Sequence, residues 1–284
     1  MIEFYILGDM GSGNKSQLQV VNGLLKDNIH KKKTFVCGLG DNIYENGCYS
    51  VDDNQFYTKF EKPYEKIPNS IKFYMCLGNH DYGYSHTDNS EFQIQYGIKS
   101  QKLNKKWFMP SKYYHYQKKK NDTTIDFFVI DTNFDRTSQE FYNKQLQNIQ
   151  SWIKQSNANW KIVIGHHTWI STADHGNADD LLNKFLTTLF THSPFDIYMC
   201  GHDHTKQVIE YTINNKKVSL IVCGTGGEKY YYEKINLHNL IDNSELLFSS
   251  LNLGFGNCHI TKKKCIINFK NQKNQLEYSY ECSK

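Results

Sequence analysis

Five segments of the chain place a side chain that can bind a metal ion directly after an apolar run and a glycine. The segments are YILGD, VCGLGD, YMCLGN, IVIGH and YMCGH, and they end in Asp9, Asp41, Asn79, His166 and His202. Oxygen and nitrogen donors without a thiolate suit iron, zinc or manganese. One such segment alone is an ordinary turn or a hydrogen-bonded core histidine, but five in one chain indicate a shared site.

These segments fall at the ends of predicted strands. Apolar runs predict strands at residues 2–7, 34–39, 72–77, 125–130, 160–164, 196–200, 207–213 and 218–223. Apolar residues at helical spacing predict helices around residues 18–25, 142–153 and 182–189, and residues 255–284 alternate as a β-meander does. Because the carboxyl ends of strands in an open α/β sheet line one crevice, we expect the donor side chains to converge there.

The composition is that of a globular protein. The chain has 284 residues, of which 39% are hydrophobic and 22% charged, and we expect one domain over residues 1–284. The net charge is +4, and lysine runs stand at 31–33, 118–120 and 262–264. We interpret these runs as solvated turns in preference to a nucleic-acid surface, and expect a monomer that binds no nucleic acid.

The first residues give little information on cellular location. MIEFYILGD is an apolar run too short for a signal peptide, and no stretch of the chain predicts a membrane span. We expect a cytoplasmic protein if Met1 is the natural start. If it is not, the resemblance given below implies a secreted or lysosomal protein.

The chain has eight cysteines. Cys37, Cys76, Cys200 and Cys223 lie in apolar runs, where a small buried thiol is expected. Cys258 could form a bridge across a hairpin with Cys265 if the compartment is oxidising. No C-x-x-C pair is present, which argues against a cysteine-ligated zinc site.

The number of donor side chains exceeds what one ion needs. Two ions about 3.5 to 4 Å apart, bridged by a shared carboxylate, form the arrangement used for in-line displacement at phosphorus. The order aspartate, aspartate, asparagine-histidine, histidine and histidine-x-histidine, from Asp9 to His204, resembles the calcineurin-like metallophosphoesterases. This resemblance implies an α/β fold, a four-layer αββα sandwich of two mixed sheets flanked by helices.

One departure from the superfamily pattern indicates a particular family within the superfamily. The usual first motif is Asp-x-His, but here Asp9 is followed by Met10 and Gly11, so one metal ligand is missing. Tyr44, in GDNIY, stands where purple acid phosphatases carry a tyrosinate ligand. The segments GHHTWISTADHG and YMCGHDH also resemble the small, single-domain tartrate-resistant acid phosphatases.

The resemblance implies two metal ions and a set of ligands. Fe³⁺ would be held by Asp9, Asp41, Tyr44 and His204, and Fe²⁺, Zn²⁺ or Mn²⁺ by Asp41, Asn79, His166 and His202. His80 and His175 match positions that contact the substrate phosphate and transfer protons. Asp81 is expected to orient the ring of His80, and His167 is favoured as a packing or outer residue over a ligand.

The implied activity is that of an acid phosphatase with a hydroxide nucleophile held by the metals. Two aspartates and one tyrosinate around a trivalent and a divalent ion leave a charge of about +2, which attracts a phosphate monoester. Phosphorylated small molecules or phosphoproteins are the expected substrates. Residues 224–234, GTGGEKYYYEK, are either a rim of the site or a surface turn.

Two alternatives remain open from the sequence. The first is another dinuclear metallophosphoesterase that hydrolyses nucleotides or phosphodiesters, which Tyr44 and the missing histidine argue against. The second is a catalytically inactive scaffold on the same fold. A scaffold would be expected to lose metal ligands, whereas this chain keeps a candidate at all seven positions.

Overall fold

A computed structural model describes residues 1–83, 88–228 and 234–284. The core is formed by two seven-stranded sheets. The first sheet has the order β14 (Leu276–Ser283), β13 (Lys264–Asn271), β12 (Gly254–Ile260), β1 (Ile2–Leu7), β2 (Val36–Gly38), β3 (Phe73–Met75) and β4 (Trp107–Phe108). The second has the order β11 (Ser244–Ser250), β9 (Lys206–Ile213), β10 (Lys216–Cys223), β8 (Ile197–Cys200), β7 (Trp160–Ile164), β6 (Thr123–Val129) and β5 (Tyr114–Lys120).

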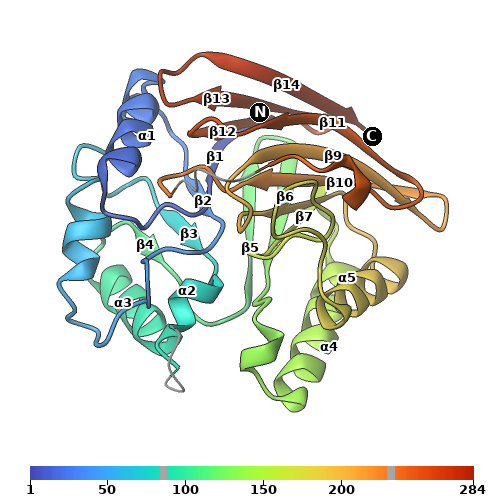
Figure 1. Cartoon of the computed structure of the whole chain (residues 1–284), viewed down its shortest axis with the longest axis horizontal. Helices are drawn as coiled ribbons and strands as arrows, with labels where there is room; N and C mark the ends of the chain where they lie inside the picture. The colour runs from blue at the N-terminus through green and yellow to red at the C-terminus, as the bar shows by residue number, and fades with distance from the viewer. Residues whose placement is uncertain (84–87, 229–233) are drawn as a thin grey trace.

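Helices cover the outer faces of the sheets. Figure 1 shows α1, α2 and α3 on the side of the first sheet and α4 and α5 on the side of the second. Their bounds are α1 (Lys15–Lys26), α2 (Asn79–Tyr82), α3 (Ser90–Lys102), α4 (Gln139–Gln155) and α5 (Asp180–His192), with short turns η1 (Ile29–Lys31), η2 (Phe56–Glu61), η3 (Phe134–Arg136) and η4 (Leu237–Asn239). The predicted α/β fold of two mixed sheets flanked by helices is therefore confirmed.

Aromatic side chains fill the space between the two sheets. The ring of Phe127, from β6, lies 5.3 Å from that of Phe4 and 5.7 Å from that of Phe35, both of the first sheet. Tyr116, on β5, stacks on Phe127 at 4.8 Å. Because rings pack well edge-to-face and in offset stacks, this cluster fixes the two sheets against each other.

Each sheet combines parallel and antiparallel strands. In the first sheet β1, β2, β3 and β4 run parallel, while β12, β13 and β14 form the antiparallel meander that the sequence predicts. In the second sheet β6, β7, β8 and β10 run parallel. The carboxyl ends of the central strands in each sheet therefore lie at one edge.

The meander corrects one expectation about the cysteines. Cys258 lies opposite Ile267, and Cys265 lies opposite Cys282. The expected hairpin bridge between Cys258 and Cys265 is therefore wrong, because the register places another cysteine across from Cys265. All eight cysteines are free thiols. Among the described residues, no helix is both long enough and apolar enough to cross a membrane.

Candidate metal centre

The donor side chains that the sequence singles out meet at one end of the two sheets. The first sheet contributes residues that follow β1, β2 and β3, and the second contributes residues that follow β7 and β8. Within each sheet these strands are parallel, so their carboxyl ends point the same way. The residues brought together are Asp9, Asp41, Tyr44, Asn79, His166, His202 and His204.

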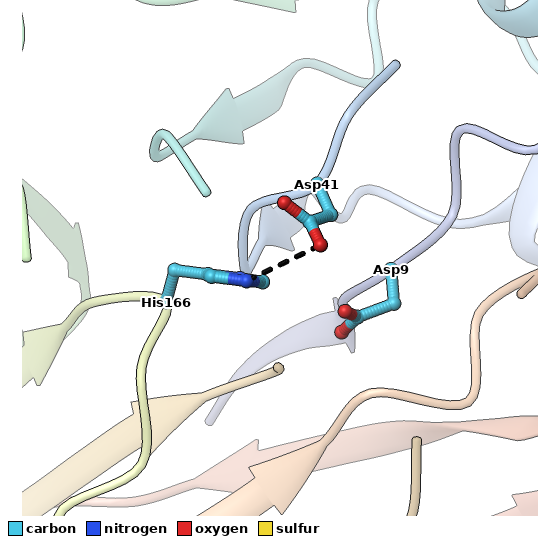
Figure 2. A group of neighbouring side chains, drawn as sticks. All are labelled: Asp9, Asp41 and His166. Carbon is cyan, nitrogen blue, oxygen red and sulfur yellow. Dashed lines mark ion pairs between the residues drawn. The ribbon is translucent and has the colours of Figure 1, made fainter. Parts of the chain in front are cut away.

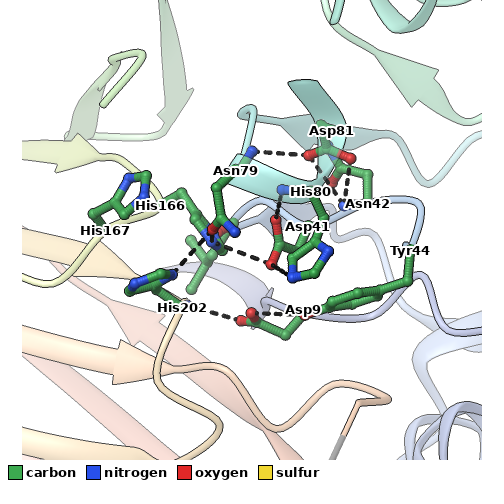
Figure 3. A network of polar contacts seen from close by, with 12 residues as sticks. Asp9, Asp41, Asn42, Tyr44, Asn79, His80, Asp81, His166, His167 and His202 are labelled. Carbon is green, nitrogen blue, oxygen red and sulfur yellow. Dashed lines mark hydrogen bonds and ion pairs between the residues drawn. The ribbon is translucent and has the colours of Figure 1, made fainter. Parts of the chain in front are cut away.

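One group of donors comprises Asp9, Tyr44 and His204. The Tyr44 Oη atom lies 3.1 Å from Asp9 Oδ1 and 3.1 Å from His204 Nε2. His204 Nε2 lies 3.3 Å from Asp9 Oδ1. Figure 3 shows the Tyr44 ring directed at Asp9 from the loop after β2. Three polar atoms from three separate loops thus face one another in a buried space.

The second group comprises Asp41, Asn79, His166 and His202. His166 Nε2 lies 3.1 Å from Asn79 Oδ1 and 3.4 Å from Asp41 Oδ2, and His202 Nδ1 lies 3.1 Å from the same Asn79 oxygen. Asp9, Asp41 and His166 offer ligand atoms within 4.8 Å of one another, as Figure 2 shows. Asp41 therefore reaches both groups, as a bridging carboxylate must.

Backbone groups orient the side chains of this cluster. The carbonyl oxygen of Leu39 lies 2.8 Å from His166 Nδ1, which leaves Nε2 directed at Asp41 and Asn79. The backbone N–H of His202 donates to Asp9 Oδ2 at 3.0 Å. The carbonyl oxygen can only accept, so Nδ1 donates to it and Nε2 is the ring nitrogen left for a metal ion. Burial would lower the pKa of His166, but the charge of Asp41 raises it to about 10, so a metal ion at Nε2 would replace a proton.

The backbone at three of these residues adopts a conformation that side chains rarely tolerate. Asp9, Asp41 and His202 have φ values of 56°, 51° and 71°. Every other non-glycine residue with positive φ in the described part of the chain is an asparagine, the residue type that tolerates this region best. Left-handed backbone at non-glycine residues costs about 1 to 3 kcal/mol each and clusters at functional sites.

Two glycines make the close approach of the strands possible. A Cβ on Gly40, where φ is +89°, would lie 2.4 Å from His166 Nδ1. A Cβ on Gly201 would lie 2.3 Å from Asp9 Oδ2. Gly40 and Gly201 are therefore needed because the donor of a neighbouring loop occupies the space where their side chains would be.

The pKa values of Tyr44 and Asp41 are both shifted in this cluster. Burial raises the pKa of Tyr44 well above its ordinary value, and the charges of Asp41 and Asp9 raise it further. Burial would also raise the pKa of Asp41, but the charges of His166 and His80 hold it well below its ordinary value. A metal ion at this point would offset the negative charges that raise the pKa of Tyr44 and would favour the phenolate. The donor set fits the metals that the resemblance implies.

The structure places His80 at the centre but gives Asp81 another role than predicted. His80 Nε2 lies 3.9 Å from Asp41 Oδ2, and its Nδ1 lies 2.7 Å from the Glu45 carbonyl oxygen. Asp81 instead accepts from the backbone N–H groups of Gly78 at 2.8 Å, Asn42 at 2.9 Å and Ile43 at 3.1 Å. The expectation that Asp81 orients the His80 ring is therefore wrong, because its carboxylate ties α2 to the loop after Asp41.

His175 lies at the exposed side of the centre. Its ring lies 4.2 Å from the ring of His202, and its backbone N–H donates to Asp203 Oδ1 at 2.9 Å. Asp203 also accepts a short hydrogen bond from the Ser171 hydroxyl. This buried carboxylate therefore anchors the loop that carries His175 to the segment between the two histidines of GHDH.

His167 lies beside the second donor group. Its Nδ1 atom lies 2.7 Å from Thr132 Oγ1, and its ring lies 4.4 Å from that of His202. Burial and the charge of His166 lower the pKa of His167 to about 3, so the ring is neutral. It packs on a donor histidine, in line with the packing or outer role expected. A cavity of about 200 Å³ opens here, lined by residues that include Thr132, Asp135, His167, His175, Asp179 and His202.

Three residues of this region were not singled out from the sequence. Asn42 donates through Nδ2 to Asp81 at 3.1 Å, and Gln93 donates to Asp81 at 2.6 Å. Asp203 is the third. Asn42 and Asp203 are adjacent to donors in the motifs GDN and GHD, which is a usable signal, whereas Gln93 lies in a helix with no motif around it.

The segment at residues 224–234 reaches the centre at its start. The backbone N–H of Glu228 donates to the Asp9 carbonyl oxygen at 2.9 Å, and Gly226 N–H donates to the Gly8 carbonyl oxygen at 2.9 Å. The first residues of the segment therefore lie against the loop that carries Asp9. Residues 229–233, with the tyrosines expected at a rim, lie outside the described residues.

Comparisons with known proteins show the family of this chain. The calcineurin-like phosphoesterase family matches residues 2–206. Purple acid phosphatase 4 of Arabidopsis thaliana is 27% identical over 301 residues, which cover 100% of this chain and 84% of that protein. Tartrate-resistant acid phosphatase type 5 of Homo sapiens is 28% identical over 209 residues, which cover 68% of this chain and 61% of that protein.

Two solved structures share the fold over nearly the whole chain. One is GAP50, described as the anchor in the inner membrane complex of Plasmodium, with a TM-score of 0.82 and 23% identity over 99% of this chain and 88% of that one. The other is purple acid phosphatase PPD1 from yellow lupin, with a TM-score of 0.75 and 15% identity over 99% of this chain and 53% of that one.

The family match spans the part of the chain that carries the donor motifs. The matched residues 2–206 include every candidate ligand from Asp9 to His204. The relatives that cover most of the chain are purple acid phosphatases, and their names imply a dinuclear metal centre. The chain belongs to the calcineurin-like phosphoesterase family, with purple and tartrate-resistant acid phosphatases as its homologues.

Proposed function

We propose that this protein is an acid phosphatase that hydrolyses phosphate monoesters with two metal ions. A ferric ion would be held by Asp9, Asp41, Tyr44 and His204, and a ferrous, zinc or manganese ion by Asp41, Asn79, His166 and His202. The observation that carries the proposal is the position of Tyr44. Its Oη atom lies 3.1 Å from both Asp9 Oδ1 and His204 Nε2. Tyr44 would therefore replace the metal ligand that the histidine of the usual Asp-x-His motif provides.

When bound, the metal ions would supply Lewis acidity, a nucleophile near neutral pH and a template for the phosphate. The residues of the chain would bind the phosphate and transfer protons. His80 stands over Asp41 and against Tyr44, with its ring 4.5 Å from the tyrosine ring, and would donate a hydrogen bond to the phosphate. His175 is on the exposed side, where it would protonate the leaving oxygen as the ester bond breaks.

The cavity beside His167, His175 and His202 supports a place for the leaving group. Its volume of about 200 Å³ accommodates a small organic group rather than a second long ester chain. The exposed residues Asp135 and Asp179 also line it, and their negative charges would disfavour a further anionic group. This arrangement favours a monoester over a phosphodiester with two bulky substituents.

A substrate comparison tests the proposal. The protein, loaded with iron and then with iron and zinc, would be assayed with p-nitrophenyl phosphate and bis-p-nitrophenyl phosphate across acidic and neutral pH. We expect kcat/KM for the monoester to exceed that for the diester by about tenfold or more, which is about 1.4 kcal/mol of transition-state binding. A preference for the diester, or activity with manganese alone and none with iron, would favour the other metallophosphoesterases instead.

The scaffold alternative is tested by the same preparation. GAP50 shares the fold but at 23% identity, so the likeness does not carry its role as an anchor to this chain. All seven donor positions are kept and lie together, which a protein without a metal centre does not require. A metal-free preparation that stays inert after metal is added would contradict the proposed activity.

A further inference from the structure

Two of the three lysine runs of the sequence line one hollow, and the third lies on a turn that follows a strand paired with the start of β1. Lys32 pairs with Glu3 of β1, with Nζ 2.7 Å from Oε1. Ile2 is paired in the sheet with Ile260, directly before the turn that carries Lys262 and Lys263. A cavity of about 180 Å³, here called the lysine pocket, is lined by Ile2, Glu3, Lys33, Thr34, Phe35, Lys118, Lys119 and Lys120.

This hollow lies opposite the candidate metal centre. The lysine pocket is at the start of β1, whereas Asp9 follows the end of the same strand. A strand of 6 residues at about 3.3 Å per residue separates the two by roughly 20 Å. Since this exceeds the Debye length of about 8 Å at physiological salt, the two positive regions act independently on ligands.

The lysine pocket has an excess of positive charge that the protein does not neutralise. Lys33, Lys119 and Lys120 are exposed, and no ion pair joins any of them to another residue in the described ranges. The acidic residue in the pocket, Glu3, is held by Lys32 at 2.7 Å and by Asn257 Nδ2 at 3.1 Å. Asp122 is the nearest acidic residue along the chain to Lys120. Several ammonium groups around one hollow repel one another unless an anion lies between them.

The side chain of Lys118 is held in position at one side of the lysine pocket. Its Nζ lies 4.8 Å from the centre of the Phe35 ring and 4.2 Å from that of the Tyr74 ring. It also makes a short hydrogen bond to the Tyr74 hydroxyl. The neighbouring Lys119 and Lys120 are held by pairing with Thr124 and Thr123 across the β5–β6 ladder. The lysines are therefore presented by ordered strand ends on one side and by the turn before β2 on the other.

We propose that the lysine pocket binds clustered phosphate groups, such as those of an inositol polyphosphate. An ammonium group binds phosphate as a point charge, so lysines on two separate segments suit an anion with more than one phosphate. The pocket is a compact hollow and lacks the long basic stripe that a nucleic-acid backbone would follow. This binding site is separate from the proposed phosphatase activity and does not depend on it.

A binding experiment with a matched control tests this site. The metal-loaded protein would be titrated with inositol hexasulfate, a polyanion that a phosphatase cannot hydrolyse, at low and high salt. The variant combines Lys33→Glu, Lys119→Glu and Lys120→Glu. The control combines Lys102→Glu, Lys154→Glu and Lys216→Glu, which makes the same charge change at exposed lysines outside the pocket.

We expect the pocket variant to bind inositol hexasulfate at least tenfold more weakly, and the control to bind it nearly as the parent protein does. Phosphomonoesterase activity and melting temperature should stay unchanged in both variants, because the substitutions are exposed and far from the centre. Equal weakening in both variants, or no salt-dependent binding by the parent, would overturn the proposal.

Vesicles distinguish the two sources of clustered phosphate. Phosphatidylcholine vesicles with and without phosphatidylinositol bisphosphate would be sedimented with the parent protein and the pocket variant. Cosedimentation of the parent, lost in the variant, supports the proposal with a lipid head group as the ligand. Binding of the soluble probe without cosedimentation supports it with a free polyanion as the ligand.

Discussion

Asp9, Asp41 and His202 share a left-handed backbone that is otherwise confined to asparagines and glycines in the described ranges. Each of these residues contributes a side chain to the candidate centre, and His202 also donates its backbone N–H to Asp9 at 3.0 Å. A fold keeps such conformations only where surrounding contacts impose them. We infer that these three loops keep a left-handed backbone because it directs the donor side chains at the candidate centre, although it costs conformational energy.

His80 and His175 provide a test of roles at the scale of single residues. Replacing either by alanine should lower kcat by about 10² to 10⁴, because each would act on the phosphate or the leaving group in the transition state. Neither belongs to the proposed ligand set, so metal content should stay near that of the parent protein. Steady-state kinetics and metal analysis of the same preparations measure both quantities.

His192→Ala is the matched control for these variants. His192 is exposed at the end of α5, away from the donor groups, and its replacement should leave kcat unchanged. If His80→Ala or His175→Ala lost metal in proportion to its rate, the assignment of that histidine to substrate contact would be contradicted.

At the scale of elements, the glycines before Asp41, Asn79 and His202 are part of the centre, because each lies against a donor side chain of another loop. Gly201→Ala would place a Cβ 2.3 Å from Asp9 Oδ2 and 3.0 Å from the Leu39 carbonyl oxygen. Overpacking of this kind costs about 1 to 3 kcal/mol. We expect the variant to lose metal affinity because Asp9 must move, and metal titration followed by thermal unfolding would show it.

Gly256→Ala is a control with similar crowding elsewhere in the first sheet. Its Cβ would lie 2.5 Å from Ile6 Cγ1, in the core and not among the donors. This variant should lose stability while it keeps the parent affinity for metal. A Gly201→Ala protein with unchanged metal affinity would show that the close approach to Asp9 is not required.

The elements also show where sequence patterns were sufficient. The predicted strands at 2–7 and 160–164 coincide with β1 and β7, because both are continuous buried apolar runs. Helix α3 was not predicted, because its buried face includes the polar residues Ser90, Gln93 and Ser100. Strand β5 was missed because it is an edge strand with the polar sequence YHYQKKK, and edge strands often carry lysine.

In the candidate site too, local sequence patterns could be recognised and contacts between separate segments could not. The glycine and donor pairs at strand ends are local patterns, so they singled out five of the seven donor side chains, and the family resemblance added Tyr44 and His204. The partners of Asp81 come from Gly78, Asn42 and Ile43, which lie in two separate segments. Adjacency to His80 in the sequence suggested the wrong partner, because a helix turn directs neighbouring side chains in different directions.

At the scale of the whole molecule, a polar cluster joins α1 to the first sheet. Asp27 accepts from Tyr5 Oη at 2.5 Å, Lys32 Nζ at 3.2 Å and Asn257 Nδ2 at 3.1 Å, and it makes a short ion pair with Lys270. Burial would raise the pKa of Asp27, but the hydrogen bonds and charges of Lys270, Tyr5 and Lys32 lower it below its ordinary value. The cluster therefore connects β1, β12 and β13 with the end of α1.

This cluster predicts a pH dependence of stability. Because the pKa of Asp27 is lower in the folded protein, its contribution is present above the unfolded value of about 3.9 and is lost as the pH falls through the folded value. Asp27→Asn should destabilise the protein by about 1 to 3 kcal/mol at pH 7, and by less as the pH falls toward the folded value. Denaturant unfolding across this range measures it.

Asp122→Asn is the control, since Asp122 is exposed on the turn after β5 and makes no ion pair with any described residue. Its replacement should change the free energy of unfolding little at pH 7 or in acid. A destabilisation of Asp27→Asn that did not shrink in acid would show that the loss comes from packing and not from the ionised carboxylate.

The central claim is that Tyr44 is a ligand of iron in a two-metal centre that joins both sheets. The most direct measurement is the visible spectrum of the purified protein, with metal stoichiometry, compared with that of Tyr44→Phe. The account predicts a violet protein with two metal ions per chain, and a Tyr44→Phe variant that has lost the visible band. An active but colourless zinc or manganese protein, or a violet band that survives in Tyr44→Phe, would contradict it.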